Sequence, residues 1–136
     1  MAKADLTKIL AVLNRRIQAW YARELPGTGI KYGLIGYIMC ICNNPGQSQE
    51  QIAGMMAVEK SSVAKAAKQL LDESYVKRNV NPDSRREYVL LPTAKARAAR
   101  KAFLPIKQRV DAHVTRDMTN IERDLFLRLL AKIPLD

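Results

Sequence analysis

The sequence is poor in aromatic residues, cysteine and histidine. Only 6% of its 136 residues are Phe, Trp or Tyr, so a core must be built mostly from Leu, Ile, Val, Ala and Met. The two cysteines, Cys40 and Cys42, stand two positions apart in an apolar stretch, and helical side chains at that spacing do not face each other. No second Cys or His cluster completes a zinc site. We expect buried thiols rather than a redox sensor, and no metal or other cofactor.

Catalytic signatures and membrane segments are missing as well. The single histidine, His113, has no Cys or carboxylate partner at a recognisable motif spacing, and there is no GxSxG, P-loop or GxGxxG motif. The longest apolar run, GLIGYIMCIC, is too short to cross a bilayer. The first residues pass directly into a helical pattern without the apolar core of a signal peptide. We therefore expect a cytoplasmic protein that has no membrane contact and is not an enzyme.

Acidic residues are scarce relative to basic ones. The chain has 13 Asp and Glu against 23 Lys and Arg, which gives a formal net charge of +10 and a pI near 9.9. Residues 59–101 alone hold 11 of the basic and 5 of the acidic side chains. A concentrated basic segment suits a polyanion, so nucleic acid is the expected partner. A generally basic protein with solvated lysines would have the same composition.

Hydrophobic spacing predicts one mainly helical domain with a small hairpin. VKRNV and EYVLL are rich in β-branched residues, and the six residues that join them should form a protruding tip. Pro105 should kink a long helix or mark the first turn of a new one. The predicted helices cover residues 5–24, 31–43, 49–56, 60–73, a segment from Thr93 to 114, and 119–133, with Ser48, Thr93 and Thr119 as candidate caps.

The helix predicted for residues 60–73 has two different faces. Its apolar arc consists of Val63, Ala67, Leu70 and Leu71, and its opposite arc of Ser61, Ser62, Lys65, Lys68, Gln69 and Asp72. Hydroxyls and long donors suit base edges and phosphates in a major groove, although a solvated helix often looks the same. A short helix, this helix and a basic hairpin follow one another, which is the order of a winged helix-turn-helix.

The segment SQEQIAGMMAVEKSSVAKAAKQLLDESYVKRNVNPDSRREYVLLPTAKAR resembles the DNA-binding core of the MarR family of transcription regulators. The specific part is the spacing of the DxRR wing relative to the KSxV helix. The chain departs from the family pattern at Ser74, where Gly is frequent, and at Ala64-Lys65, where Thr-Arg is frequent; Lys lacks the bidentate fork of Arg, so the base preference should differ. The matching positions are Ile52, Ala53, Lys60, Ser61, Val63, Leu70, Val76, Arg78, Pro82, Asp83, Arg85, Arg86 and Leu91.

The resemblance implies a homodimeric, sequence-specific regulator, usually a repressor. Residues 1–30 would form an N-terminal dimerisation helix, 31–92 the winged helix-turn-helix region and 93–136 the C-terminal dimerisation helices, within one structural domain. The partner would be double-stranded DNA with a pseudo-palindromic site and half-sites about one turn (~10 bp) apart. Two alternatives stay open: a weakly specific chromatin-like DNA-binding protein and a winged-helix protein-interaction module.

The resemblance also assigns roles to individual side chains. Arg86 would enter a minor groove beside the wing, and Asp83 would pair with Arg85 or Arg86 and orient the tip. Phosphates would be neutralised by Lys60, Lys65, Lys68 and Arg78. The candidate contacts of the recognition helix are Lys60, Ser61, Ser62, Lys65, Lys68 and Gln69, and those of the wing are Arg78, Arg85 and Arg86.

Many relatives release DNA when a small aromatic anion binds. The local candidates for such a site are Tyr32 and Tyr37 with basic neighbours such as Arg15 or Arg16, although core packing and solvation explain these residues as well. Some relatives instead sense oxidants through a cysteine near the second helix. One of the two cysteines could do so here only if it were exposed with a lowered pKa.

Overall fold

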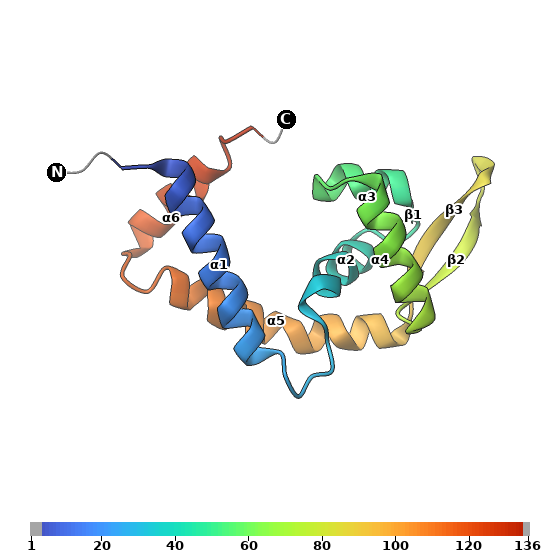
Figure 1. The fold of residues 1–136 in the computed structure, drawn as a ribbon, viewed down its shortest axis with the longest axis horizontal. Helices are drawn as coiled ribbons and strands as arrows, with labels where there is room; N and C mark the ends of the chain where they lie inside the picture. The colour runs from blue at the N-terminus through green and yellow to red at the C-terminus, as the bar shows by residue number, and fades with distance from the viewer. Residues whose placement is uncertain (1–3, 135–136) are drawn as a thin grey trace. The chain divides into compact units, whose positions relative to one another are not determined.

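The computed structural model of the chain describes residues 4–134, which belong to two compact units. The terminal unit combines the chain up to Glu24 with the chain from Pro105 onward, and the central unit is Leu25–Leu104. The helices and strands are α1 (Leu6–Glu24), α2 (Tyr32–Asn43), β1 (Gln47–Ser48), α3 (Gln49–Met56), α4 (Lys60–Asp72), β2 (Val76–Asn81), β3 (Ser84–Pro92), α5 (Ala94–Val114) and α6 (Asn120–Leu130) (Figure 1). The expected mainly helical fold with a small β-hairpin is confirmed. No helix within residues 4–134 is long and apolar enough to span a membrane.

Local capping signals set the beginnings of α3 and α6. The Ser48 hydroxyl accepts a hydrogen bond from the Gln51 N–H at 3.1 Å, and the Gln51 side chain accepts one from the Ser48 N–H at 2.8 Å. Thr119 and Glu122 form the same capping box at α6. The bonds from the Thr119 N–H and the Thr119 side chain lower the pKa of the Glu122 carboxyl. Both predicted caps are therefore confirmed.

The two C-terminal helices differ in detail from the prediction. The Thr93 hydroxyl accepts from the Ala96 N–H at 3.3 Å and caps α5 as expected. Pro105 lies inside α5, so the alternative of a new helix beginning there is wrong. Helix α6 ends at Leu130 and not at 133, because the last residues continue only as a turn.

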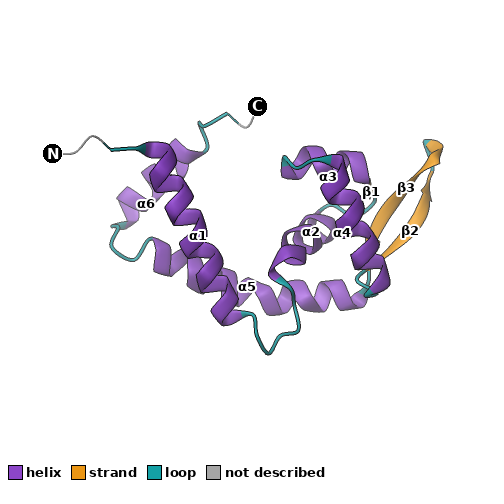
Figure 2. Ribbon diagram, in the orientation of Figure 1, coloured by secondary structure: helices purple, strands orange, loops and turns teal. Residues whose placement is uncertain are grey.

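The central unit is built around one apolar core. Helix α4 buries a stripe at helical spacing, and the exposed hairpin β2–β3 follows it directly (Figure 2). Predicted Leu71 is only half-buried, whereas Ala66 is buried. The largest fully buried side chains of this core are Ile38, Ile41, Ile52, Val63, Leu70 and Leu90.

The sheet is antiparallel with strand order β1–β3–β2. Strand β1, which was not predicted, pairs Ser48 with Val89 and so ties the start of α3 to the wing. The two wing strands extend further than predicted, and only Pro82 and Asp83 connect them. The expectation of a six-residue tip is wrong because polar residues continue both strands.

The wing contains an irregularity on the β3 side. Val80 pairs with Tyr88 and the next residue of β2, Asn81, pairs with Ser84. Residues 85–87 therefore have no counterparts on β2 and form a bulge. Arg85 and Arg86 therefore lie in the bulge and not in the connecting turn, and a bulge changes the direction of a side chain such as that of Arg86.

A residue with a left-handed backbone follows the end of helix α4, two positions after Asp72. Ser74 has φ +64°, and the following Tyr75 N–H bonds to the Leu70 carbonyl at 2.8 Å. The position where the resemblance implied a glycine thus has the conformation that glycine tolerates best. The Thr93 hydroxyl donates to the Ser74 carbonyl at 2.7 Å and fixes this end of α4 to the start of α5.

Replacing Ser74 with glycine is expected to stabilise the protein by about 0.5–1 kcal/mol. A left-handed backbone costs a residue with a side chain about 1–2 kcal/mol, and glycine avoids this cost. Glycine also loses more conformational entropy on folding, which cancels part of the stabilisation. The measurement is the urea midpoint of unfolding. Ala64→Gly, at an exposed position inside α4, is the matched control and should lose about 1 kcal/mol. A lower midpoint for Ser74→Gly would contradict the strain argument.

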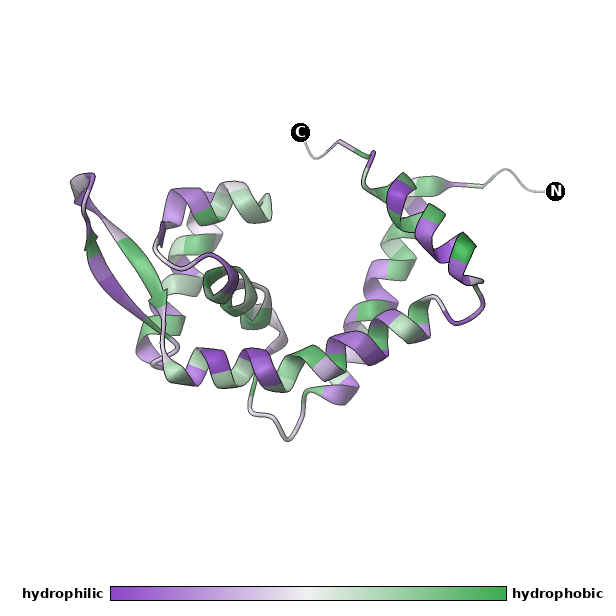
Figure 3. Cartoon of the chain, turned by 180° about the vertical axis from the view of Figure 1, so that it is seen from behind, coloured by the Kyte–Doolittle hydropathy of each residue, from purple (hydrophilic) through white to green (hydrophobic). Residues whose placement is uncertain are grey.

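The terminal unit leaves many apolar side chains uncovered. Helix α6 has no buried residue, and hydrophobic and hydrophilic residues alternate around α1 and α6 (Figure 3). Ile121 is 82% exposed, Leu125 54% and Leu129 53%. These three residues recur every four positions and therefore share one stripe of the helix. On α1, Leu6, Ile9 and Leu10 are exposed in the same way.

Candidate DNA interface

Helix α4 exposes a polar face along its whole length. Ser61, Ser62, Lys65 and Lys68 are exposed and Gln69 is half-buried, while the opposite stripe is buried. This face has no large apolar side chain. The face can therefore offer two hydroxyls, two ammonium groups and one amide to a partner without steric obstruction.

Lys60, the first residue of α4, is engaged by another residue of the helix-turn-helix. Its Nζ lies 2.9 Å from Glu50 Oε1 on the first turn of α3, and both side chains are mostly exposed. An exposed ion pair contributes little to stability and exchanges readily. A phosphate could replace this carboxylate as the partner of Lys60 without leaving a buried charge behind.

The wing turn is held by a side chain that sequence reasoning did not single out. Asn81 Oδ1 accepts from the Asp83 N–H at 3.0 Å, and Asn81 Nδ2 donates to Glu87 Oε2 at 3.4 Å. No ion pair between Asp83 and Arg86 occurs among the described side chains. The Arg85 side chain lies outside the described residues. Arg86 itself is exposed beside the start of α3, where it lines a hollow of about 240 Å³.

A second wing arginine rests on an aromatic ring. The Arg78 Cζ lies 5.0 Å from the centroid of the Tyr88 ring, at the distance of a cation–π contact. Tyr88 is 52% exposed and was not among the predicted site residues. Its alternation with Leu90 on β3, two positions apart on one face of the strand, was the available signal.

The predicted ligand residues fall in different parts of the chain. Tyr37 lines a hollow of about 430 Å³ in the central unit, where its neighbours are Lys31 and three residues of the exposed face of α4, namely Ser62, Lys65 and Gln69. Tyr32, also on α2, does not line it. Arg15 and Arg16 are on α1 of the terminal unit, and Arg16 lines another hollow there. Sequence reasoning missed Lys31, which directly precedes α2.

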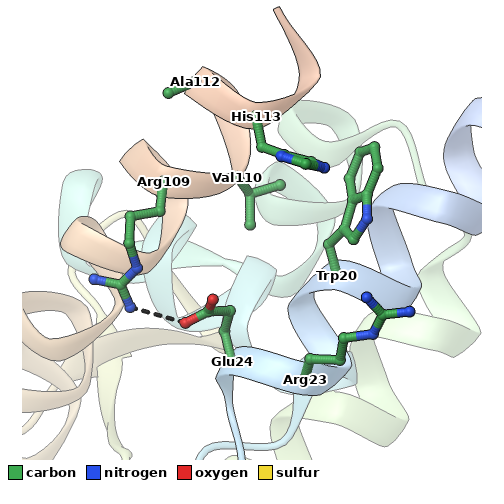
Figure 4. A pocket seen from close by; sticks show the side chains of 7 residues that line it. All are labelled: Trp20, Arg23, Glu24, Arg109, Val110, Ala112 and His113. Atoms are coloured by element: carbon green, nitrogen blue, oxygen red, sulfur yellow. Dashed lines mark hydrogen bonds and ion pairs between the residues drawn. The ribbon is translucent and has the colours of Figure 1, made fainter. Parts of the chain in front are cut away.

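The terminal unit has a hollow of its own between α1 and the distal half of α5 (Figure 4). The rings of Trp20 and His113 meet edge to face with centroids 4.5 Å apart. Beside them, Arg109 Nη2 donates to Glu24 Oε2 at 2.9 Å. Arg23 completes the polar lining of this site of about 490 Å³. The Arg109–Glu24 pair is internally neutral, so Arg23 supplies the remaining cation.

The two cysteines are half-buried and not fully buried as expected. Both are only partly accessible, and burial raises the pKa of the Cys40 thiol. Burial also raises the pKa of Cys42, against the opposing effect of Arg100 and Arg97. A raised pKa keeps the thiolate fraction small at neutral pH, which agrees with the expectation of inert thiols.

Comparison with known proteins identifies the family. Residues 35–88 match the MarR family, a span that covers the helix-turn-helix and most of the wing. A protein of Thauera aromatica, named as a transcriptional regulatory protein for the hcr operon, is 32% identical over 114 residues, which are 83% of this chain and 69% of that protein.

Solved structures agree in fold. A MarR protein from Peptoclostridium difficile superposes with a TM-score of 0.88 at 21% identity, over 97% of this chain and 86% of that one. The structure of Bordetella bronchiseptica BpsR, described with the regulation of its DNA binding by 6-hydroxynicotinic acid, gives a TM-score of 0.84 at 16% identity, over 93% and 96% of the two chains. The exposed recognition face, the wing, the matched residues and the fold lead to one conclusion: the chain belongs to the MarR family of DNA-binding transcriptional regulators.

Proposed function

We propose that this protein is a homodimeric, sequence-specific repressor acting in the cytoplasm. The observation that carries the proposal is the exposed hydroxyl, lysine and amide face of α4 next to a basic wing. Ser61, Ser62 and Gln69 would meet base edges in the major groove, because hydroxyls and amides can both donate and accept. Lys60, Lys65 and Lys68 would neutralise phosphates, and Arg86 would enter the flanking minor groove.

The dimer in this proposal forms through the terminal unit. Its support is the stripe of Ile121, Leu125 and Leu129, three apolar side chains that are more than half exposed in the single chain. Phe126, Leu127 and Leu130 instead line a hollow with α1 and α5 of the same chain. One chain therefore occupies one side of α6 and leaves the other side for a second copy. Two-fold symmetry would then require a pseudo-palindromic operator.

A small monoanion with an apolar body is the proposed effector. The hollow that contains Tyr37 supports this proposal because it combines Lys31 and Lys65 with the apolar Leu34 and Ala66. The Lys31 Nζ lies 3.4 Å from Glu73 Oε1, so Lys65 supplies the uncompensated charge. An aromatic acid regulates BpsR. Thermal shift with 6-hydroxynicotinate checks the site; a shift that Tyr37→Ala leaves unchanged would exclude it.

The decisive experiment is nuclease footprinting on the DNA upstream of the protein's own gene, with random DNA as competitor at moderate salt. A specific regulator is expected to protect a site with two-fold symmetry. This protection should persist in an excess of random DNA, because specific affinities exceed non-specific ones by about 10³-fold or more. Uniform protection that disappears as salt rises would support a weakly specific, chromatin-like DNA-binding protein instead. No protection of any DNA would support the protein-interaction module.

A further inference from the structure

The face of the wing sheet that packs into the core continues beyond the core as an exposed patch. Val76 and Leu90 are buried at its inner end, whereas Val80 is 59% and Tyr88 52% exposed at its outer end. Val80 pairs with Tyr88, and Arg78 pairs with Leu90 one step inward on the same face. Arg78 and Tyr88 are thus diagonal cross-strand neighbours, a position from which long and aromatic side chains reach each other.

In this patch the exposed cation of Arg78 is supported by an aromatic ring and not by a carboxylate. Its Cζ lies 5.0 Å from the Tyr88 ring centroid, and no ion pair of Arg78 occurs among the described side chains. An arginine paired with a carboxylate would have to exchange that partner before meeting a phosphate. An arginine on an aromatic face keeps its N–H donors available at the edge of the guanidinium while its plane is held.

We propose that Tyr88 is a positioning residue for DNA binding, which holds Arg78 in a fixed orientation so that its guanidinium binds a backbone phosphate. The proposal rests on the proposed function in that the wing must meet DNA, and it adds a residue to that function. Holding the side chain before binding reduces the rotamer entropy that it loses on contact. The hydroxyl of Tyr88 is not needed for this role, since the ring face alone attracts the cation.

The test is a double-mutant cycle on a fluorescent random-sequence duplex, because phosphate contacts do not depend on base sequence. Tyr88→Leu is expected to weaken binding about two- to fivefold, the range for an exposed cation–π contact. Tyr88→Phe should bind like wild type. In an Arg78→Gln background, Tyr88→Leu should have no further effect. In a Lys77→Gln background, which removes a neighbouring strand charge instead, the full effect should remain.

Other results would contradict the proposed role of the Tyr88 ring. If Tyr88→Phe is as weak as Tyr88→Leu, the hydroxyl and not the ring is responsible. If Tyr88→Leu weakens binding equally with and without Arg78, the two residues act independently. Helicity by circular dichroism checks folding, which should not change because both side chains are exposed. Failure of the wild-type protein to bind any duplex would overturn the proposed function as well, whereas a zero coupling with normal binding overturns only this inference.

Discussion

Leu125→Glu is expected to convert the dimer into monomers and to weaken operator binding by about 10²–10⁴-fold. Leu125 is 54% exposed in the single chain and lies in the middle of the uncovered stripe of α6. In a symmetric dimer the two copies of one residue lie in the same interface, so each substitution would place two carboxylates in an apolar contact. A monomer would bind one half-site only and would lose the high effective concentration that links the two recognition helices.

Sedimentation equilibrium measures the first effect and fluorescence anisotropy on the footprinted operator the second. Met55→Glu is the matched control for mass, since Met55 is 50% exposed on α3 of the central unit and undergoes the same change of chemistry. It should remain dimeric. Because Leu125 is already exposed in the protomer, its replacement should leave helicity unchanged. A Leu125→Glu protein that sediments as a dimer would show that α6 is not the interface.

The helices were predictable because their signals are local. Ser48 with Gln51, and Thr119 three residues before Glu122, are capping pairs that can be recognised without tertiary information. The exposed face of α4 was correct for the same reason, since helical periodicity alone separates its two sides. Ala66 was missed because alanine is compatible with either side, and only packing shows that it is buried.

The wing and the hollows depend on contacts that periodicity does not encode. Strand β1 has two residues, too few to show an alternating pattern, and it exists because Ser48 pairs with Val89. The bulge at residues 85–87 follows from the pairing of Asn81 with Ser84. The polar residues of this segment do not indicate which of them will pair. Tyr37 and Lys65 line the same hollow only because α2 packs near α4. The sequence therefore predicted which side of α4 is exposed better than it predicted the contacts that shape the wing and the hollows.

Arg86→Ala is expected to weaken operator binding by about 1–3 kcal/mol while leaving the thermal midpoint and the dimer mass unchanged. The side chain is exposed, so its removal leaves no cavity. Arg86 lies in the bulge, next to the hydrogen bond from Asn81 to Glu87. We expect the backbone to keep its direction there when the Arg86 side chain is removed. The loss should therefore appear in DNA binding alone, measured by anisotropy on the footprinted operator.

Arg86→Lys separates the two possible roles of this arginine. A narrow minor groove favours arginine, whose weakly hydrated guanidinium loses less on entering it than a lysine ammonium does. If Arg86 enters the groove, Lys should restore little of the binding lost with Ala, and the remaining difference should depend on the A·T content beside the half-sites. If Arg86 only neutralises a phosphate, Lys should restore binding almost fully, with a salt dependence like that of wild type. The second result would assign the wing to positioning and leave sequence readout to α4.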